Sequence, residues 1–135
     1  MAARLYLLVV VSLLSVFASS DMLVGGPETI DPSDPQVLQA ARFALSGFNQ
    51  QLKEDYKFKL LKVVSAEAQV VAGVIYTVNV DIGKTDCKKD STSDAQSCSL
   101  MQNSNLAQTL SCTFKVLEVP WENVEKVLYA SCKAL

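Results

Sequence analysis

A period of two dominates the middle of the chain, because every even-numbered position from Val64 to Ile82 is apolar. These side chains belong to Val64, Ala66, Ala68, Val70, Ala72, Val74, Tyr76, Val78, Val80 and Ile82. Such alternation is typical of a β-strand with one buried face. One strand of this length would reach about 60 Å, whereas a domain of about 100 residues has a radius of gyration of about 13 Å. We therefore predict a hairpin with its tip at Gln69–Gly73, since Gly73 is the only good turn former before Gly83.

The predicted tip is apolar where a turn is usually polar. It contains no Asn-Gly or Asp-Gly pair, and Val70, Val71 and Ala72 would stand at an end of the sheet. A β-branched residue such as Val71 in a tight turn predicts backbone strain. Apolar side chains in this position also predict that a partner covers them.

A helix is predicted before this hairpin. Asp34 is a good N-cap and Pro35 suits the first helical position. Apolar side chains then recur at helical spacing, and the pattern predicts a helix of four to five turns that ends near Glu54–Asp55. The apolar positions are Val37, Ala41, Ala44, Leu45, Phe48 and Leu52.

The remaining pattern predicts strands and one long polar segment. A strand opens at Tyr56, and a break in its alternation predicts a bulge near Leu61. Residues 84–109 are polar and predict a surface excursion, after which 110–116 and 124–132 alternate as two further strands. The fold class predicted is α+β, with one long α-helix packed across a four- to five-stranded antiparallel β-sheet.

The first residues of the chain indicate export. Residues 1–20 combine Arg4, a short apolar run and small residues at Ala18 and Ser20, as in a cleaved signal peptide. Residues 21–33 have no periodicity and include Gly25, Gly26 and Pro27, which predicts a flexible N-terminal arm on a single domain spanning 21–135. We expect a secreted, extracellular protein.

Four cysteines lie in the exported part: Cys87, Cys98, Cys112 and Cys132. An even number in a small secreted domain predicts two disulfides, and spacing alone leaves all three pairings open. A zinc site is the alternative, but the chain has neither a C-x-x-C motif nor a histidine.

The same composition weighs against catalysis. Without histidine no Ser–His or Cys–His pair can form, and Asp86, Asp90 and Asp94 lack the glycine and closing glutamate of a calcium loop. We expect no catalytic residue, no metal and no cofactor. The chain has 12 Lys and Arg against 14 Asp and Glu, and this mild balance does not favour nucleic acid or a membrane as partner.

Two other segments are candidates for binding. Trp121, the only tryptophan, follows Pro120 at a predicted turn, and taken alone it favours packing against the core over contact with a partner. Leu23 and Val24 are apolar, but taken alone the arm favours a flexible tail. In a meander, alternate turns share one end of the sheet, so the hairpins at 69–73 and 120–121 would lie together.

These segments resemble the cystatin family in sequence and in order. Gln69-Val70-Val71-Ala72-Gly73 fits the Q-x-V-x-G signature, Leu23-Val24-Gly25-Gly26 resembles the N-terminal segment, and Pro120-Trp121 resembles the second hairpin. Four cysteines in the C-terminal half and a signal peptide are similar to the secreted, type 2 members. The resemblance implies a reversible, tight-binding inhibitor of papain-like cysteine proteases such as cathepsins, and not an enzyme.

The resemblance also implies which residues bind. Leu23, Val24, Gly25, Gln69, Val70, Val71, Ala72, Gly73, Pro120 and Trp121 would contact the protease. The implied disulfides are Cys87–Cys98 and Cys112–Cys132. We expect a monomer, with an inactive domain-swapped dimer that would relieve strain at Val71. The alternative is a secreted cystatin-fold protein for host defence or interaction, with little protease inhibition.

Overall fold

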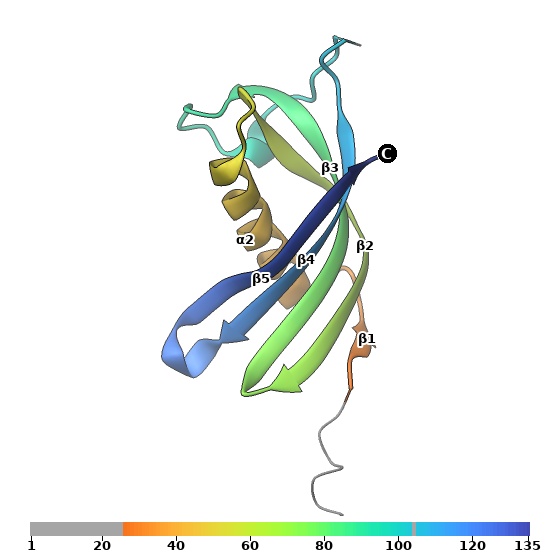
Figure 1. Ribbon diagram of the computed structural model, residues 1–135, viewed down its shortest axis with the longest axis vertical. Helices are drawn as coiled ribbons and strands as arrows, with labels where there is room; N and C mark the ends of the chain where they lie inside the picture. Colours follow the sequence, from red (N-terminus) through yellow and green to blue (C-terminus); the bar gives the residue numbers. More distant parts are fainter. Residues whose placement is uncertain (1–25, 104) are drawn as a thin grey trace, which may run out of the picture.

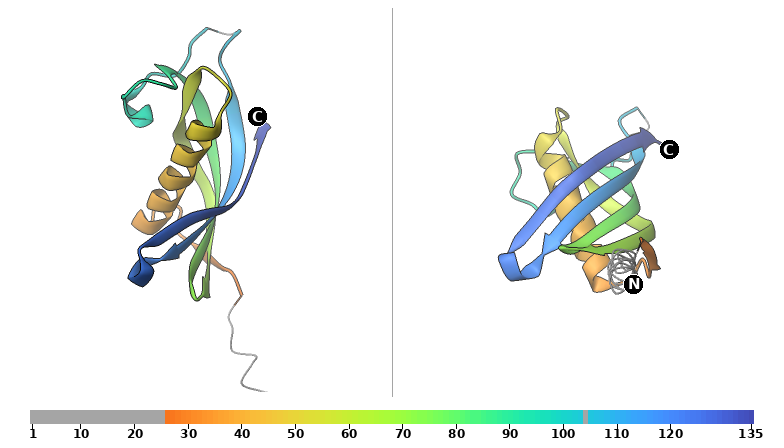
Figure 2. Two further views of the ribbon diagram at one scale, coloured as in Figure 1. Left: turned by 60° about the vertical axis from the view of Figure 1, so that its left-hand side comes forward. Right: turned by 60° about the horizontal axis from the view of Figure 1, so that its bottom comes forward.

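The computed structural model describes residues 26–103 and 105–135, which form one helix and a five-stranded antiparallel sheet (Figure 1). The elements are β1 (Glu28–Ile30), α2 (Pro35–Gln51), β2 (Tyr56–Val71), β3 (Gly73–Lys88), η2 (Ala95–Ser97), β4 (Thr109–Val119), η3 (Pro120–Glu122) and β5 (Val124–Ala134). The strands follow one another in the order β1-β2-β3-β4-β5, and α2 crosses one face of the curved sheet (Figure 2). The predicted fold class is confirmed.

The N-terminal segment differs from the predicted flexible arm within its described part. Glu28, Thr29 and Ile30 form β1 and pair with Ala68, Glu67 and Ala66 of β2. Alternation cannot reveal a strand of three residues, so the pattern gave no sign of it. Residues 21–25 of the predicted arm lie outside the described residues.

Helix α2 begins where the sequence predicts and ends earlier. The Asp34 carboxylate accepts a hydrogen bond from the Gln36 amide at 2.8 Å, and Pro35 occupies the first turn. The buried face carries several small side chains, which let the helix axis approach the sheet closely. It consists of Val37, Ala40, Ala41, Ala44, Leu45 and Asn49. The helix ends at Gln51, not at Glu54–Asp55, because Leu52 is already extended (ψ 138°).

The core lies between α2 and the inner face of the sheet. The even-numbered residues of β4, and those of β3 as far as Ile82, point inward, as the alternation predicts. They include Tyr76, Val78, Val80, Ile82, Cys112, Phe114 and Val116, all buried. Phe48 of the helix contacts Phe58 and Phe114 edge-on, with ring centroids 5.8 and 6.3 Å apart.

Both disulfides implied by the family resemblance are present. Cys112 and Cys132 face each other across the β4–β5 ladder, and their bridge joins the last strand to its neighbour. Cys87 and Cys98 join the end of β3 to the residue after η2. The segment predicted as a polar excursion therefore starts later than residue 84, since β3 continues to Lys88.

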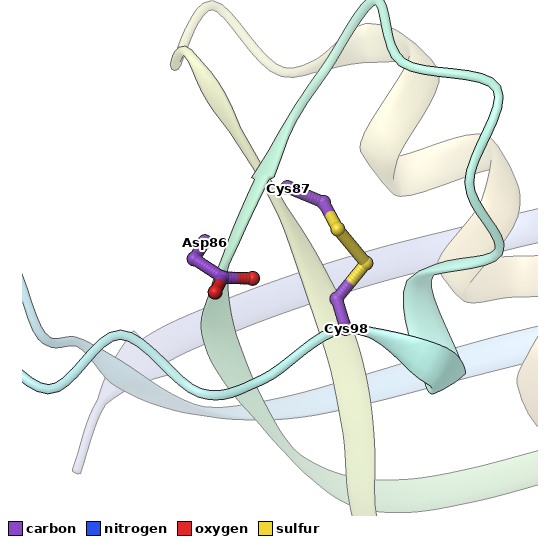
Figure 3. A group of neighbouring side chains, drawn as sticks. All are labelled: Asp86, Cys87 and Cys98. Carbon is purple, nitrogen blue, oxygen red and sulfur yellow. A yellow bond between two sulfur atoms is a disulfide. The ribbon is translucent and has the colours of Figure 1, made fainter.

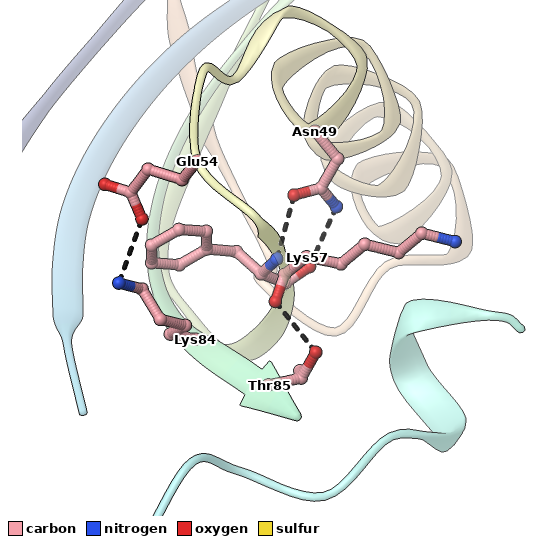
Figure 4. A network of polar contacts seen from close by, with 6 residues as sticks. Asn49, Glu54, Lys57, Lys84 and Thr85 are labelled. Carbon is pink, nitrogen blue, oxygen red and sulfur yellow. Dashed lines mark hydrogen bonds and ion pairs between the residues drawn. The ribbon is translucent and has the colours of Figure 1, made fainter. Parts of the chain in front are cut away.

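Side-chain amides complete the outer edge of β2, where β1 does not reach. Asn49 of α2 bonds both main-chain groups of Phe58, accepting from the N–H at 2.8 Å and donating to the carbonyl at 2.9 Å. Gln96 of η2 does the same for Leu60, at 2.6 and 3.2 Å. Figure 4 shows the Asn49 pair with the neighbouring Thr85 hydroxyl, which donates to the Lys57 carbonyl. These contacts fix the helix against the start of β2.

Strand β2 contains the predicted bulge. Its pairing with β3 shifts register between Leu60 and Lys62, so Leu61 has no partner in the ladder and stays exposed. Such a bulge increases the local twist and bends the strand.

Replacing Asn49 by Ala tests the helix-to-edge contact. Asn49→Ala leaves the N–H and carbonyl of buried Phe58 without partners, so we expect the free energy of unfolding to fall by about 2–3 kcal/mol. Gln50→Ala is the matched control, because Gln50 is the exposed neighbour on the same helical turn. Urea unfolding of both variants measures the difference, and equal midpoints would contradict this account.

Candidate functional site

The two hairpins of interest lie at the same end of the sheet. The β2–β3 turn and the β4–β5 turn both point toward the end opposite the C-terminus (Figures 1 and 2). Strand β1 reaches the same end, since Glu28 pairs with Ala68, close to where β2 stops at Val71. The structure thus brings together the two hairpins that the sequence predicted as neighbours. Leu23, Val24 and Gly25 lie outside the described residues.

The β2–β3 tip is tighter than the five-residue turn predicted. Gln69 pairs with Ile75, Val70 with Val74, and Val71 with Gly73, so the ladder continues until Ala72 alone makes the turn. Val70 is 71% exposed and Val71 is 39% exposed. The two valines are therefore held by strand geometry, Ala72 forms the turn, and all three are exposed to solvent.

Gly73 makes this turn possible in two ways. Its φ is +121°, a conformation that side chains with a Cβ rarely adopt. A Cβ here would also lie 2.5 Å from the Glu118 carbonyl oxygen and 2.9 Å from the Val119 Cγ2. The strain predicted at Val71 is wrong, because Val71 is an ordinary ladder residue and Gly73 takes the special conformation.

The β4–β5 hairpin presents the tryptophan. Pro120–Glu122 form a single 3-10 turn, and Asn123 closes it in the left-handed conformation with φ 53°. Trp121 is 71% exposed, so packing against the core is excluded for its indole. An exposed tryptophan on one hairpin and exposed valines on the other, at the same end of the sheet, are the kind of apolar surface that marks a binding site.

Sequence reasoning missed a carboxyl group beneath this hairpin. Glu118 is buried, with 7% of its surface exposed, although it directly precedes Val119-Pro120-Trp121. Burial raises the pKa of the Glu118 carboxyl, and the Glu125 carboxylate on β5 raises it further. Its even number, in phase with Cys112, Phe114 and Val116, was the signal that could have placed it on the inner face.

The apolar end is a projecting surface, whereas a cleft in the described part of the chain lies elsewhere. That cleft, of about 620 Å³, lies between α2 and the segment 89–96 and is lined mostly by polar and charged residues. Its lining includes Arg42, Asn49, Lys57, Asp90 and Asp94. Projecting side chains suit insertion into a partner's groove better than capture of a small molecule.

One group of potential metal ligands occurs in residues 26–103 and 105–135. Asp86, Cys87 and Cys98 place their ligand atoms within 4.8 Å of one another (Figure 3). The two sulfurs are joined in a disulfide and offer no thiolate. A single carboxylate remains, which is not a metal site.

Comparison with known proteins identifies the same kind of domain. A family model described as the cystatin domain matches residues 25–121. Cystatin-2 of Crotalus adamanteus is 37% identical over 110 residues, covering 82% of this chain and 80% of that protein. Human cystatin-F is 41% identical over 97 residues, covering 72% of this chain and 67% of that protein.

A solved structure agrees with the sequence comparison. The crystal structure of dimeric human cystatin F superposes with a TM-score of 0.77 at 38% identity. The match covers 83% of this chain and 89% of that one.

Gly73→Ala tests whether the two hairpins depend on their close contact. The added Cβ meets the Glu118 carbonyl and the residue keeps an unfavourable φ, so we expect unfolding free energy to fall by about 2–4 kcal/mol. Gly47→Ala is the control, because a Cβ there meets nothing within 4 Å on α2 and should stabilise by about 0.5–1 kcal/mol. Chemical denaturation measures both. A Gly73→Ala variant as stable as the wild type would show that the contact is dispensable.

Proposed function

This chain belongs to the cystatin family, and we propose that it is a secreted, reversible, tight-binding inhibitor of papain-like cysteine proteases of the cathepsin type. As a cystatin it is a protease inhibitor and not an enzyme. One observation carries the proposal. Val70 and Trp121, the exposed apolar side chains of two hairpins, lie at one end of the sheet and do not pack in the core.

The two hairpins would enter the active-site cleft as a wedge. Val70, Val71 and Ala72 supply one apolar edge, while Pro120 and Trp121 supply the other. Gln69 and Gly73 shape the first hairpin, since Gln69 is half-buried in the ladder and Gly73 is buried against β4. Because the hairpins are already ordered, docking would cost little conformational entropy.

The wedge would obstruct the nucleophile without being cut. A protease cleaves an extended segment whose main chain is free to pair with the cleft. Here the main chain of Val71 and Gly73 is committed to the β2–β3 ladder, and Ala72 lies in a one-residue turn. No peptide bond of the tip can extend along the cleft unless the hairpin opens, which supports reversible blockage.

The N-terminal segment would complete the contact. Leu23 and Val24 would fill subsites on the non-primed side, with Gly25 giving the main chain freedom to bend. The position of β1 supports this, because its first residue, Glu28, already lies near the wedge end of β2.

Export and a single-chain state fit the same proposal. Two disulfides are typical of secreted domains, and residues 1–20 match a signal peptide. Within the described residues, no helix is long and apolar enough to cross a bilayer. We propose that the mature protein acts as a monomer on cathepsin-like proteases, without a nucleic-acid or membrane partner.

Truncating the wedge should weaken inhibition of papain without unfolding the protein. We expect Trp121→Ala to cost about 2–4 kcal/mol of binding, or about 30- to 700-fold in Kd. Deletion through Val24 should also weaken binding, and both effects should appear mainly as faster dissociation. Progress curves with papain and the purified mature chain measure the rates.

Thermal unfolding is the control for this experiment. Because Trp121 is 71% exposed, its loss should hardly change the melting temperature. Strong inhibition by Trp121→Ala would contradict the wedge. If the wild-type chain itself fails to inhibit papain, the alternative of a host-defence or interaction protein with the same fold takes its place.

Opening the β2–β3 turn should give an inactive dimer. Ala72 is the only residue between two 16-residue strands. If the turn straightened, two chains could exchange the segment formed by β1, α2 and β2, and each segment would pack against β3 of the other chain. We expect gel filtration after mild heating to separate a dimer that does not inhibit papain, because the tip has become part of a continuous strand. A dimer with full inhibitory activity would contradict this.

A further inference from the structure

We propose that Glu118 is a positioning residue that makes inhibition tighter in acid: once protonated, it donates a hydrogen bond to Glu125 and holds the two strands together at the base of the second hairpin. This inference rests on the proposed function. It describes how pH would regulate protease binding by the same two hairpins, through a residue that lies outside their apolar contact surface.

The geometry of Glu118 is that of a buried acid without a partner for its charge. The residue is 7% exposed, and its Oε1 has no hydrogen-bond partner within the described part of the chain. Glu125 lies directly opposite in the β4–β5 ladder and is half-buried. The Gln39 side-chain amide of α2 donates to Glu125 Oε2 at 3.2 Å, which holds that carboxylate in place.

Within the described part of the chain, neither Glu118 nor Glu125 forms an ion pair. Burial raises the pKa of the Tyr76 hydroxyl on β3, and the carboxylates of Glu118 and of Asp34, at the start of α2, raise it further. Arg42 borders the same shallow pocket as Glu125 but forms no ion pair with it. The one ion pair among residues 26–103 and 105–135 joins Lys84 and Glu54 (Figure 4). Lys84 lies near the end of β3, whereas Val74, the ladder partner of Glu118, lies near its start.

Protonation resolves this conflict. Burial raises the pKa of the Glu118 carboxyl, and the charge of Glu125 raises it further. The pair is therefore most stable when Glu118 is neutral, a condition fully met below the ordinary glutamate pKa of about 4.3. That stabilisation is lost as the pH rises through the raised pKa of Glu118.

Glu118 also connects the two hairpins. Its carbonyl oxygen is the atom closest to the missing Cβ of Gly73, and its ladder partner on β3 is Val74. On the other side, the β4–β5 ladder ends with Val119 opposite Val124, just before Pro120 and Trp121. Repulsion between the two carboxylates thus acts at the base of the second hairpin, and a shared proton removes it.

Binding of a protease would strengthen the effect. A cleft that covers Pro120 and Trp121 excludes water from the half-buried Glu125 and from Glu118 beneath it. Loss of water favours the neutral form of Glu118, so binding takes up a proton and is favoured by acid.

The first test needs no protease. Glu118→Gln mimics the neutral acid, and we expect its melting temperature to exceed that of the wild type by about 3 °C or more at pH 7.4. The difference should shrink as the pH falls to 4. Glu122→Gln removes one charge from the same hairpin at an exposed position, so its pH profile should follow the wild type. Equal pH profiles for Glu118→Gln and the wild type would overturn the inference.

The second test measures dissociation of papain from the wild type, Glu118→Gln and Glu125→Gln at pH 7.4 and pH 5.0. The ratio of the dissociation rate constant at pH 7.4 to that at pH 5.0 should be about three- to tenfold larger for the wild type than for Glu118→Gln. Comparing ratios cancels the titration of papain itself. Glu125→Gln removes the charge that opposes Glu118, so its ratio should lie between the other two.

The failures of the two proposals differ. If the wild type and both variants inhibit papain and share the same ratio of dissociation rate constants, the role of Glu118 is overturned, whereas the proposed inhibitory function stands. Absence of inhibition by the wild type at both pH values would overturn the proposed function, and with it the role of Glu118 in inhibition.

Discussion

The close approach of Gly73 to the main chain of Glu118 sets the arrangement of the apolar end. Strand β3 begins so near the end of β4 that a Cβ at residue 73 would lie 2.5 Å from the Glu118 carbonyl oxygen. Only a residue without a side chain allows this contact, and a φ of +121° at Gly73 accompanies the return of the chain from β2 after a single turn residue. The two hairpins therefore form one surface, and their apolar side chains project from it together.

The remainder of the fold keeps that end in place from the inside. Small side chains on α2 bring the helix close to the even-numbered residues of β3 and β4, and Phe48 fills the space between Phe58 and Phe114. The Cys112–Cys132 bridge ties β5 to β4 away from the apolar end. A surface held by a packed core and covalent links is preorganised for its partner, so little conformational entropy is lost on binding.

Much of this fold could be predicted from periodicity, and the parts that could not have physical reasons. Alternation from Val64 to Ile82 located two strands and most of their inner face, and Asp34-Pro35 located the helix start. The alternation was wrong at Val64, which is exposed because a register shift between Val63 and Ser65 turns Val63 toward the core instead. The helix end was missed because Leu52 continues the helical pattern although its main chain is extended. Periodicity also does not predict how deeply a turn residue is buried, so it could not show that Trp121 is exposed to solvent.

The width of the first hairpin and the burial of Glu118 depended on tertiary contact. Residue preferences in turns indicated Gly73. The length of the turn could not be predicted, because it depends on the pairing of β2 with β3, which continues to Val71. The alternation did place Glu118 in phase with core residues, and the polarity of its side chain concealed this. Residues 23–25, for which sequence resemblance implies contact with the protease, remain a prediction.

The amide pairs along β2 have a consequence for the behaviour of the protein in concentrated solution. An open sheet edge is a template, because any strand that joins it offers a new edge to the next chain. Asn49 and Gln96 satisfy the main chain of Phe58 and Leu60 with a single amide each, and an amide offers no further edge. The sheet thus ends at these positions with side chains that cannot propagate it, and stacking of copies there would first have to displace them.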